Sequence, residues 1–425
     1  MVIFHIDVNN AFLSWDAVYR LTELNESLDL RDIPAVIGGD EAKRHGIVLA
    51  KSTPAKAYGI RTAETLAEAR KKCPNITIVP PRHHIYKKFS AELISHLQTL
   101  TPVVEQYSID EAFADMTGCP LLAGRSPVEA ANLIREDIYH RFGYTVNIGV
   151  SSNKVLAKMA SDFEKPDKVH SLFPHEIEKK MWPLPVSDLF LVGRASAKKL
   201  YNLGIRTIGE LARSDKAIIR SHMGKHGELI HGYANGIDPS PVLREQPESK
   251  GYGNSTTLPR DVTDAEEAKH SIRNLCDSVG SRLRADDFSA QVIAVTIKDN
   301  RFRHVSHQCT MPAATNVAGE LYRYACALFD EAWDGSPIRL LGVTATKLTR
   351  ESSRQLSLLD GEFYARQGNM SRVSATKLTR ERSRQPGLLD REFYARQGKM
   401  EHTVDEIRKK YGHNAIFRAS NLEKK

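Results

Sequence analysis

The sequence is poor in cysteine and in long apolar runs. Its 425 residues include only five cysteines, and no two of them form a CxxC pair. This argues against a disulfide framework and a cysteine zinc site, and it fits a reducing cytoplasm. No stretch approaches the roughly 18 apolar residues of a membrane span. The first residues, MVIFHIDVNN, have no basic leader, so we do not interpret them as a signal peptide.

Composition and length leave room for several folded domains and for a polyanionic partner. Apolar residues make up 41% of the chain, and its length predicts about two to four domains. Lys and Arg number 60 against 52 Asp and Glu, so the formal net charge is +8. Such a surplus permits nucleic-acid binding, because Lys and Arg neutralise phosphates. Many proteins that bind no nucleic acid carry a similar charge, so both interpretations stay open.

Strand and helix patterns alternate in the first part of the chain, which predicts an α/β or α+β region. Apolar periodicity and turn residues indicate the individual elements. We expect a buried strand at 1–8, a hairpin at 34–52, helices at 60–73, 86–100, 127–142 and from Asn153, a strand pair around 104–117 and a strand at 145–151.

The middle of the chain predicts short helices, a linker and a second small domain. Residues 183–235 have the pattern of short helices, and residues 236–250 are rich in Pro, Ser and charge, as linkers are. Residues 251–350 contain two strand patterns, AQVIAVTIKD and IRLLGVTATKL, and two expected helices at 264–284 and 315–333. These elements predict an α+β domain.

A tandem repeat follows, because residues 343–370 recur almost unchanged at 373–400. Two copies do not make a solenoid, so an internal duplication is the simpler interpretation. The strand pattern IRLLGVTATKL runs into the first copy, whereas the second copy has no apolar entry. We therefore expect the first copy to complete a sheet and the second copy to be mobile or loosely packed.

Three acidic residues are candidates for metal binding. Asp7 ends the first buried strand, and Asp110 and Glu111 lie in YSIDEAF near the turn of the expected strand pair. Carboxylates that face one another repel unless a hard cation lies between them, and Mg²⁺ prefers oxygen ligands. Two such ions can support phosphoryl transfer. On residue types alone, ordinary surface acids at strand ends are the simpler interpretation.

Three segments carry a resemblance to a known family. HIDVNNAF, YSIDEAFADMT and NIGVSSNKVLAKMASDFEKPDK occur in the order and spacing of the Y-family translesion DNA polymerases, in particular the DNA polymerase IV group of Gram-positive bacteria. The resemblance covers about residues 1–350 and the tail. It implies that Asp7, Asp110 and Glu111 hold two Mg²⁺ ions with the carbonyl of Val8. Many relatives have Asp where this chain has Asn9, a position that is not a core ligand.

The same resemblance assigns residues to the nucleotide. Phe12 matches the steric gate, whose ring collides with a ribose 2′-hydroxyl, although a core aromatic is the ordinary interpretation of a lone Phe. Lys165 matches a triphosphate contact. Two further contacts, a Tyr and an Arg in relatives, are Thr53 and Lys56 here, so a point charge replaces a bidentate fork. Lys154 and Lys158 share a face of the expected helix, which is typical of a solvated surface.

Residues 188–211 resemble a helix–hairpin–helix. Gly193 and the following turn would direct backbone N–H groups toward a DNA phosphate, with Lys198 nearby. The second glycine of the usual motif is Ala195 here, and a plain helical hairpin is the alternative.

The tail contains a peptide that resembles the sliding-clamp-binding motif of bacterial polymerases. In QLSLLD at 355–360 the matching residues are Gln355, Leu356, Leu358 and Leu359. The second copy reads QPGLLD at 385–390, which is a weaker match.

The expected fold class is a multidomain α+β right-hand polymerase. It has a palm with a ferredoxin-like sheet, fingers, a helical thumb with a helix–hairpin–helix, and a little-finger domain. The predicted domains are the palm at 1–10 and 78–168, the fingers at 11–77, the thumb at 169–238, a linker at 239–249, the little finger at 250–350 and the tail at 351–425.

The resemblance implies a low-fidelity, template-directed DNA polymerase for translesion synthesis and repair. Its partners would be primer–template DNA, a dNTP and a sliding clamp, and we expect a monomer at the nucleoid of the bacterial cytoplasm, with no membrane partner. The alternative is a non-catalytic, clamp-tethered DNA-binding protein, which the changes at Thr53 and Lys56 favour slightly.

IGGDEA at 37–42 resembles the start of a diguanylate cyclase signature, but Ala42 replaces the aromatic residue of that signature.

Overall fold

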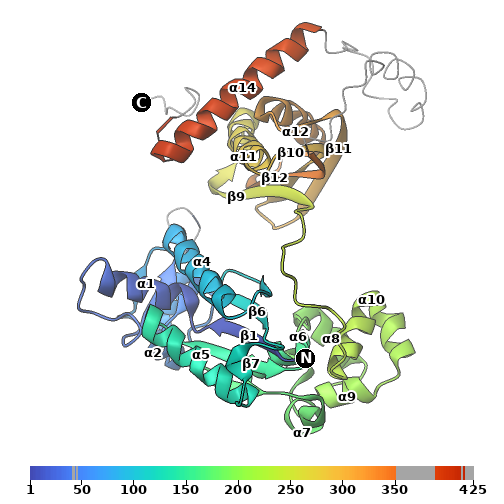
Figure 1. The fold of residues 1–425 in the computed structure, drawn as a ribbon. Helices are drawn as coiled ribbons and strands as arrows, with labels where there is room; N and C mark the ends of the chain where they lie inside the picture. The colour runs from blue at the N-terminus through green and yellow to red at the C-terminus, as the bar shows by residue number, and fades with distance from the viewer. Residues whose placement is uncertain (41–43, 45, 351–387, 413–414, 417–425) are drawn as a thin grey trace. The chain divides into compact units, whose positions relative to one another are not determined.

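The computed structural model describes residues 1–40, 44, 46–350, 388–412 and 415–416. The chain forms two compact units (Figure 1). The first unit comprises Met1–Glu41 and His45–Pro247, and the second comprises Glu248–Lys425 together with Ala42–Arg44. Each unit has its own apolar core.

The first unit is built on a five-stranded sheet with the order β5-β6-β1-β7-β8. The central strand pairs antiparallel with β6 on one side and β7 on the other. The expected strands are confirmed, and β8 extends the sheet beyond the predicted palm boundary at 168. The five strands are β1 (Ile3–Val8), β5 (Val104–Gln106), β6 (Glu111–Asp115), β7 (Val146–Ser151) and β8 (Val169–Ser171).

Strand alternation gives the two faces of this sheet different roles. Phe4, Ile6 and Val8 pack with the helices α4 (His83–Leu100) and α5 (Pro127–Phe142). Residues 3, 5 and 7 point to the other face, where α6 (Lys154–Ser161) lies very close to the sheet. A Cβ at Gly149 of β7 would approach the carbonyl oxygen of Ala157 to 1.9 Å, so only glycine permits this packing.

The expected fingers form a smaller three-stranded sheet with the order β3-β2-β4. The predicted hairpin is confirmed as β2 (Ala35–Gly38) and β3 (Val48–Lys51). A third strand, β4 (Thr77–Val79), pairs parallel with β2 and was not predicted. The other elements are α1 (Ala11–Thr22), α2 (Thr53–Ala57) and α3 (Leu66–Lys72), so the helix expected at 60–73 begins later than predicted.

The end of the first unit is helical, as predicted. Its helices enclose a separate apolar core, to which α6 also contributes. They are α7 (Ile177–Lys180), α8 (Arg194–Asn202), α9 (Ile208–Arg213) and α10 (Lys216–Ala234).

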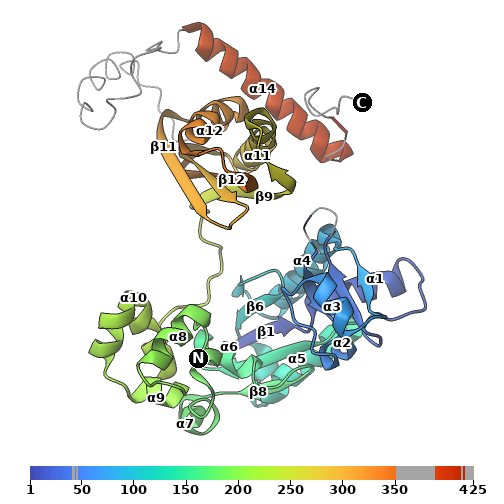
Figure 2. The same ribbon diagram turned by 180° about the vertical axis from the view of Figure 1, so that it is seen from behind.

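The second unit is an antiparallel sheet with the order β11-β10-β12-β9, packed against α11 and α12 (Figure 2). The two predicted strands are its centre, and the two edge strands were not predicted. The elements are β9 (Gly251–Val262), α11 (Ala265–Ala285), β10 (Phe288–Asp299), β11 (His304–Thr315), α12 (Ala318–Ala332) and β12 (Ile338–Arg350).

The repeat contributes to this unit at both of its ends. Strand β12 includes residues 343–350, so the first copy does complete the sheet. Helix α14 (Leu388–Tyr411) contains the end of the second copy and lies against α11 and α12 (Figures 1 and 2). Gln397 packs on Gly319, and Gly398 lies close to Val317. The prediction that the second copy is loosely packed is therefore wrong for its last residues.

An acidic residue directly after the repeat anchors α14. The carboxylate of Glu401, which is 4% exposed, accepts hydrogen bonds from the Arg284 guanidinium at 2.7 Å and from the Ala318 backbone N–H at 2.9 Å. The second contact caps the start of α12, whose own N-cap residue, Val317, makes no side-chain cap. Asp405 also accepts a hydrogen bond from Arg284, at 2.7 Å. In the first copy the corresponding residues are Ser371 and Ala375, so only the second copy continues into this anchor.

Candidate active site

Two of the three predicted carboxylates face one another across neighbouring strands. Asp7 near the end of β1 is paired in register with Glu111 at the start of β6. The backbone N–H of Val8 donates to the carbonyl of Asp110 at 3.0 Å, which joins the two strand ends. Antiparallel pairing thus brings together acids that are about a hundred residues apart in the sequence.

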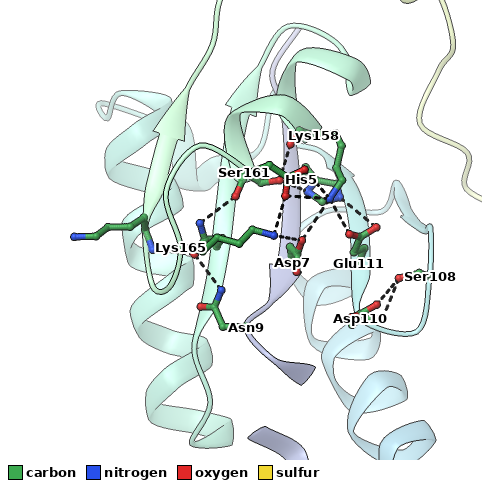
Figure 3. Close-up of polar contacts among 12 residues, drawn as sticks. His5, Asp7, Asn9, Ser108, Asp110, Glu111, Lys158, Ser161 and Lys165 are labelled. Carbon is green, nitrogen blue, oxygen red and sulfur yellow. Dashed lines mark hydrogen bonds and ion pairs between the residues drawn. The ribbon is translucent and has the colours of Figure 1, made fainter. Parts of the chain in front are cut away.

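Asp110 precedes β6 and is held by its own turn. Its carboxylate accepts a hydrogen bond from the Ser108 hydroxyl at 2.6 Å, and its backbone N–H donates to the same hydroxyl oxygen at 3.2 Å. Figure 3 shows Asp110 beside Ser108, while Asp7 and Glu111 point toward two lysines. Ser108 therefore fixes the third carboxylate, a role that the sequence did not indicate.

Lys158 and Lys165 neutralise this acidic group. The Lys158 ammonium lies 2.8 Å from Glu111 and 3.4 Å from Asp7, and it is only 8% exposed. The Lys165 ammonium lies 2.7 Å from Asp7 and 2.8 Å from Asp162. The interpretation of Lys158 as part of a solvated face is therefore wrong, because α6 turns it into the sheet.

In each of these groups, burial and the neighbouring charges act on the pKa in opposite directions. Burial raises the pKa of the Glu111 carboxyl, and the hydrogen bond from Lys158 offsets part of this effect. Burial of the two ammonium groups opposes their charge, but the carboxylates of Asp7 and Asp162 outweigh it and raise the pKa of Lys158 and Lys165. Both lysines are thus cations at neutral pH.

A neutral histidine lies beneath the acidic group. His5 is fully buried on β1, and its Nδ1 lies 2.8 Å from the hydroxyl of Ser161. Burial, followed by the positive charges of Lys158 and Lys165, holds the pKa of His5 well below its usual range. The Ser161 hydroxyl donates to the Lys158 carbonyl at 2.7 Å, so it accepts from His5 and links the strand to α6.

A buried amide pair holds the segment that carries Lys165. The Asn9 amide donates to Asn147 at 3.1 Å, and its oxygen accepts the backbone N–H of Asp167 at 2.9 Å. Asn147 donates in turn to the carbonyls of Ser161 and Glu164. Asn9 lines the same cavity as the acids, and both ends of its amide are used to hold the segment that carries Lys165.

One cavity of about 430 Å³ brings the predicted site residues together. Acidic residues, Phe12, lysines and hydroxyls all contribute to its wall, so residues from β1, β3, α1, α2, β6 and the loop after α6 meet at one place. The predicted residues that line it are Asp7, Val8, Phe12, Thr53, Lys56, Asp110, Glu111 and Lys165, and the lining also includes Lys51 and Thr62.

The donor atoms suit a hard cation, because carboxylate oxygens are the ligands that Mg²⁺ prefers. In the protein alone, Lys158 and Lys165 supply the positive charge beside Asp7 and Glu111. Among the residues that the structure describes, no group of three or more His, Cys, Asp or Glu side chains is gathered closely enough to hold a metal. The residues therefore fit Mg²⁺ in their chemistry, although the three carboxylates are not arranged as ligands without it.

The predicted DNA contacts lie at the start of α8, away from this cavity. Gly193 is the N-cap of α8, and Ala195 and Lys198 follow on its first turns, all three exposed. The turn at Gly193 lies between a short 3-10 helix, Val186–Asp188, and α8. The clamp-like peptide with Gln355, Leu356, Leu358 and Leu359 lies outside the described residues.

Comparisons with known proteins agree with this arrangement. Residues 6–162 match the impB/mucB/samB family, residues 174–205 match the IMS family HHH motif, and residues 249–358 match the impB/mucB/samB family C-terminal domain. A solved Y-family DNA polymerase chimera superimposes with a TM-score of 0.70 at 20% identity, over 82% of this chain and 100% of that chain. The fold is thus that of the right-hand polymerases.

Curated relatives identify the branch of this class. DNA polymerase IV of Clostridium acetobutylicum is 45% identical over 100% of this chain and 98% of its own length. DNA polymerase IV of Alkaliphilus oremlandii is 35% identical over 100% of this chain and 99% of its own length. The chain belongs to the Y family of DNA polymerases, in its DNA polymerase IV group.

Membership establishes the activity at the level of the family. The protein is a DNA-directed DNA polymerase of translesion synthesis, which binds primer–template DNA and a dNTP, and the non-catalytic alternative is not favoured. Y-family polymerases depend on metal ions. No helix in the described part of the chain is long and apolar enough to cross a membrane.

Proposed function

We propose that Asp7, Asp110 and Glu111, with the carbonyl of Val8, hold two Mg²⁺ ions that serve dNMP transfer to a primer 3′-hydroxyl. The observation that carries this proposal is that one cavity is lined both by these acids and by the lysines Lys56 and Lys165. When bound, the ions favour deprotonation of the hydroxyl and stabilise the leaving pyrophosphate.

The residues of the chain position the reactants. Phe12 lies in the cavity wall and excludes a 2′-hydroxyl by shape. Lys165 pairs with Asp7 and lines the cavity, which supports a role in which its ammonium exchanges Asp7 for a phosphate oxygen of the nucleotide. Thr53 contributes a hydroxyl and Lys56 a point charge to the same nucleotide. Positioning and charge stabilisation account for most of the rate enhancement.

Calorimetric titration of Ca²⁺ tests the metal assignment without turnover. The sample is the complex of the full chain with primer–template DNA that ends in a 3′-deoxy residue and the correct dNTP. We expect two ions per wild-type complex and fewer in Asp7→Asn and Glu111→Gln. Glu105→Gln is the matched control, because Glu105 is a buried acid of the same sheet that pairs with Lys154. Binding of two ions by every variant would contradict the assignment of Asp7 and Glu111 as metal ligands.

The helix–hairpin–helix is proposed to hold a DNA phosphate at Gly193, Ala195 and Lys198. Helix N-termini attract phosphates, and such contacts carry no sequence information. Lys198→Ala is expected to weaken DNA binding equally for different sequences and to reduce the salt dependence by about one phosphate. An unchanged salt slope would contradict this contact.

The tail is proposed to bind a sliding clamp through the first repeat copy, at Gln355, Leu356, Leu358 and Leu359. In the second copy Leu388 and Leu389 begin helix α14, whereas a clamp peptide binds in a groove as a short extended segment. Clamp binding should therefore be lost in the double change Leu358→Ala and Leu359→Ala and retained after Leu388→Ala and Leu389→Ala. The reverse result would assign the second copy. We also propose that the protein acts as a monomer at the nucleoid, as the family resemblance implies.

A further inference from the structure

Lys51 is a further basic residue of the nucleotide cavity. It is the last residue of β3 and lines the cavity with Thr53, Lys56 and Thr62. Neither its position in the sequence nor the family resemblance assigned it a role. Lys51 ends β3 directly before α2, the helix that carries Thr53 and Lys56. These two residues depart from the pattern of the relatives.

Within the part of the chain that the structure describes, no carboxylate forms an ion pair with Lys51. Its ammonium donates only to the hydroxyl of Thr62, at 3.3 Å, and no ion pair to Lys51 or Lys56 occurs within the described residues. Glu64, whose charge acts on Lys51, is engaged with Lys72 at 2.5 Å. Lys51 is half-buried, and burial, followed by the charge of Lys56, lowers its pKa.

Two unpaired ammonium groups at one cavity wall repel each other, and an anion between them removes this cost. The cavity lining also contains Asp7, Asp110 and Glu111, and the proposed function puts the reacting α-phosphate beside these acids. A polyphosphate tail extending from that point reaches the lysine wall with its outer phosphates. Compact ammonium groups bind phosphate oxygens as point charges, so two of them can replace one bidentate guanidinium.

We propose that Lys51 binds the outer phosphates of the incoming nucleotide together with Lys56, in place of the fork that an arginine provides in relatives. This proposal rests on the proposed function, because it takes the cavity as the dNTP site. It predicts that Lys51 acts on nucleotide binding through the phosphates and not through the base or sugar.

The test compares Lys51→Ala, Lys51→Arg and the control Lys71→Ala, an exposed lysine of α3 that lies outside the cavity. Steady-state insertion of one nucleotide gives kcat and KM, and inorganic tripolyphosphate serves as a competitive inhibitor that has no base or sugar. In Lys51→Ala we expect KM for dNTP and Ki for tripolyphosphate to rise together by about tenfold. We expect kcat to stay within a factor of about two, Lys51→Arg to retain most of the affinity, and the control to match the wild type.

Each outcome separates this proposal from the proposed function. Insertion by the wild type with unchanged KM and Ki in Lys51→Ala overturns the role of Lys51 alone. A rise in KM without a rise in Ki assigns Lys51 to the base or sugar and also overturns it. Absence of insertion by the wild type instead counts against the proposed site. If Lys51→Ala unfolds, Lys51→Gln keeps the length of the side chain, removes the charge and gives the same test.

Discussion

Phe12 stacks on Tyr86, with ring centroids 4.6 Å apart and an interplanar angle of 12°. The Tyr86 hydroxyl donates to the buried carboxylate of Asp16 at 3.0 Å, and Arg82 donates to the same carboxylate. The ring of Phe12 is therefore supported from behind on the side away from the cavity, so it cannot withdraw from a 2′-hydroxyl without disturbing the core.

Removal of this ring should admit ribonucleotides. In Phe12→Ala the space opens, and we expect the preference for dNTP over rNTP to fall by at least about tenfold. Competing insertion of one rNTP or dNTP opposite the same template base measures it. Phe12→Tyr keeps the ring and should keep the discrimination. Unchanged discrimination in Phe12→Ala would refute the steric-gate assignment.

Lys158 should stabilise the folded protein when no metal ion is bound, because its ammonium offsets the charge of the neighbouring carboxylates. Lys158→Gln removes the ammonium partner of Glu111 and leaves Asp7 with Lys165 alone, so we expect a loss of about 1–3 kcal/mol of unfolding free energy in EDTA. Saturating Ca²⁺ should restore most of it, because the ion supplies the missing charge. Thermal unfolding with and without Ca²⁺ measures the effect.

The matched control for Lys158 is Lys154→Gln, one helical turn earlier. Lys154 also pairs with a buried carboxylate, Glu105, at 2.7 Å, but this pair lies outside the cavity. We expect Lys154→Gln to be destabilised to a similar extent but not to be rescued by Ca²⁺. Equal rescue of both variants, or of neither, would contradict the role of Lys158.

Asn9 should influence nucleotide binding through Lys165. Asn9→Ala removes the hydrogen bonds to Asn147 and to the backbone of Asp167, so the segment with Lys165 loses one anchor and keeps only those that Asn147 supplies. We expect KM for dNTP to rise several-fold, which corresponds to about the free energy of one lost hydrogen bond. The rise should be larger in Lys165→Ala. Asn132→Ala, which removes an amide on α5 remote from the cavity, is the control. A wild-type KM in Asn9→Ala would refute the coupling.

Glu401 should stabilise the start of α12. Glu401→Ala removes both the cap on Ala318 and one partner of Arg284, which together should cost about 2–3 kcal/mol locally. Hydrogen exchange of the full chain should show faster exchange at residues 318–321. The exposed Glu406 on the same helix gives the control Glu406→Ala. Equal protection in both variants would show that α14 does not cap α12.

In the second unit the sequence predicted the two central strands and missed the two edge strands, for a physical reason. Strands β10 and β12 are rich in apolar residues and lie at the centre of their sheet. The edge strands β9 and β11 are mostly polar and contain Pro259 and Pro312, as edge strands tolerate. Strand β4 was missed because its parallel pairing depends on a distant partner, which no local pattern reveals.

The site shows the same division between local and long-range information. Asp7, Asp110 and Glu111 could be proposed from the sequence because their motifs are local, and the structure places all three in the lining of one cavity. Lys158 was misread, because helical spacing placed it beside Lys154 and did not reveal which side of α6 meets the acids. Lys51 carried no local signal, since a lysine at a strand end is ordinary until the fold places it in a cavity.

The most direct test of the whole account is extension of a primed template by the pure full-length protein with Mg²⁺ and dNTPs, beside Asp110→Ala. Asp110 is held by Ser108 and pairs with no lysine among the described contacts, so its loss should spare the fold. The account predicts extension by the wild type and none by Asp110→Ala, although both bind DNA. Extension by Asp110→Ala at the wild-type rate would contradict the assignment of the active site.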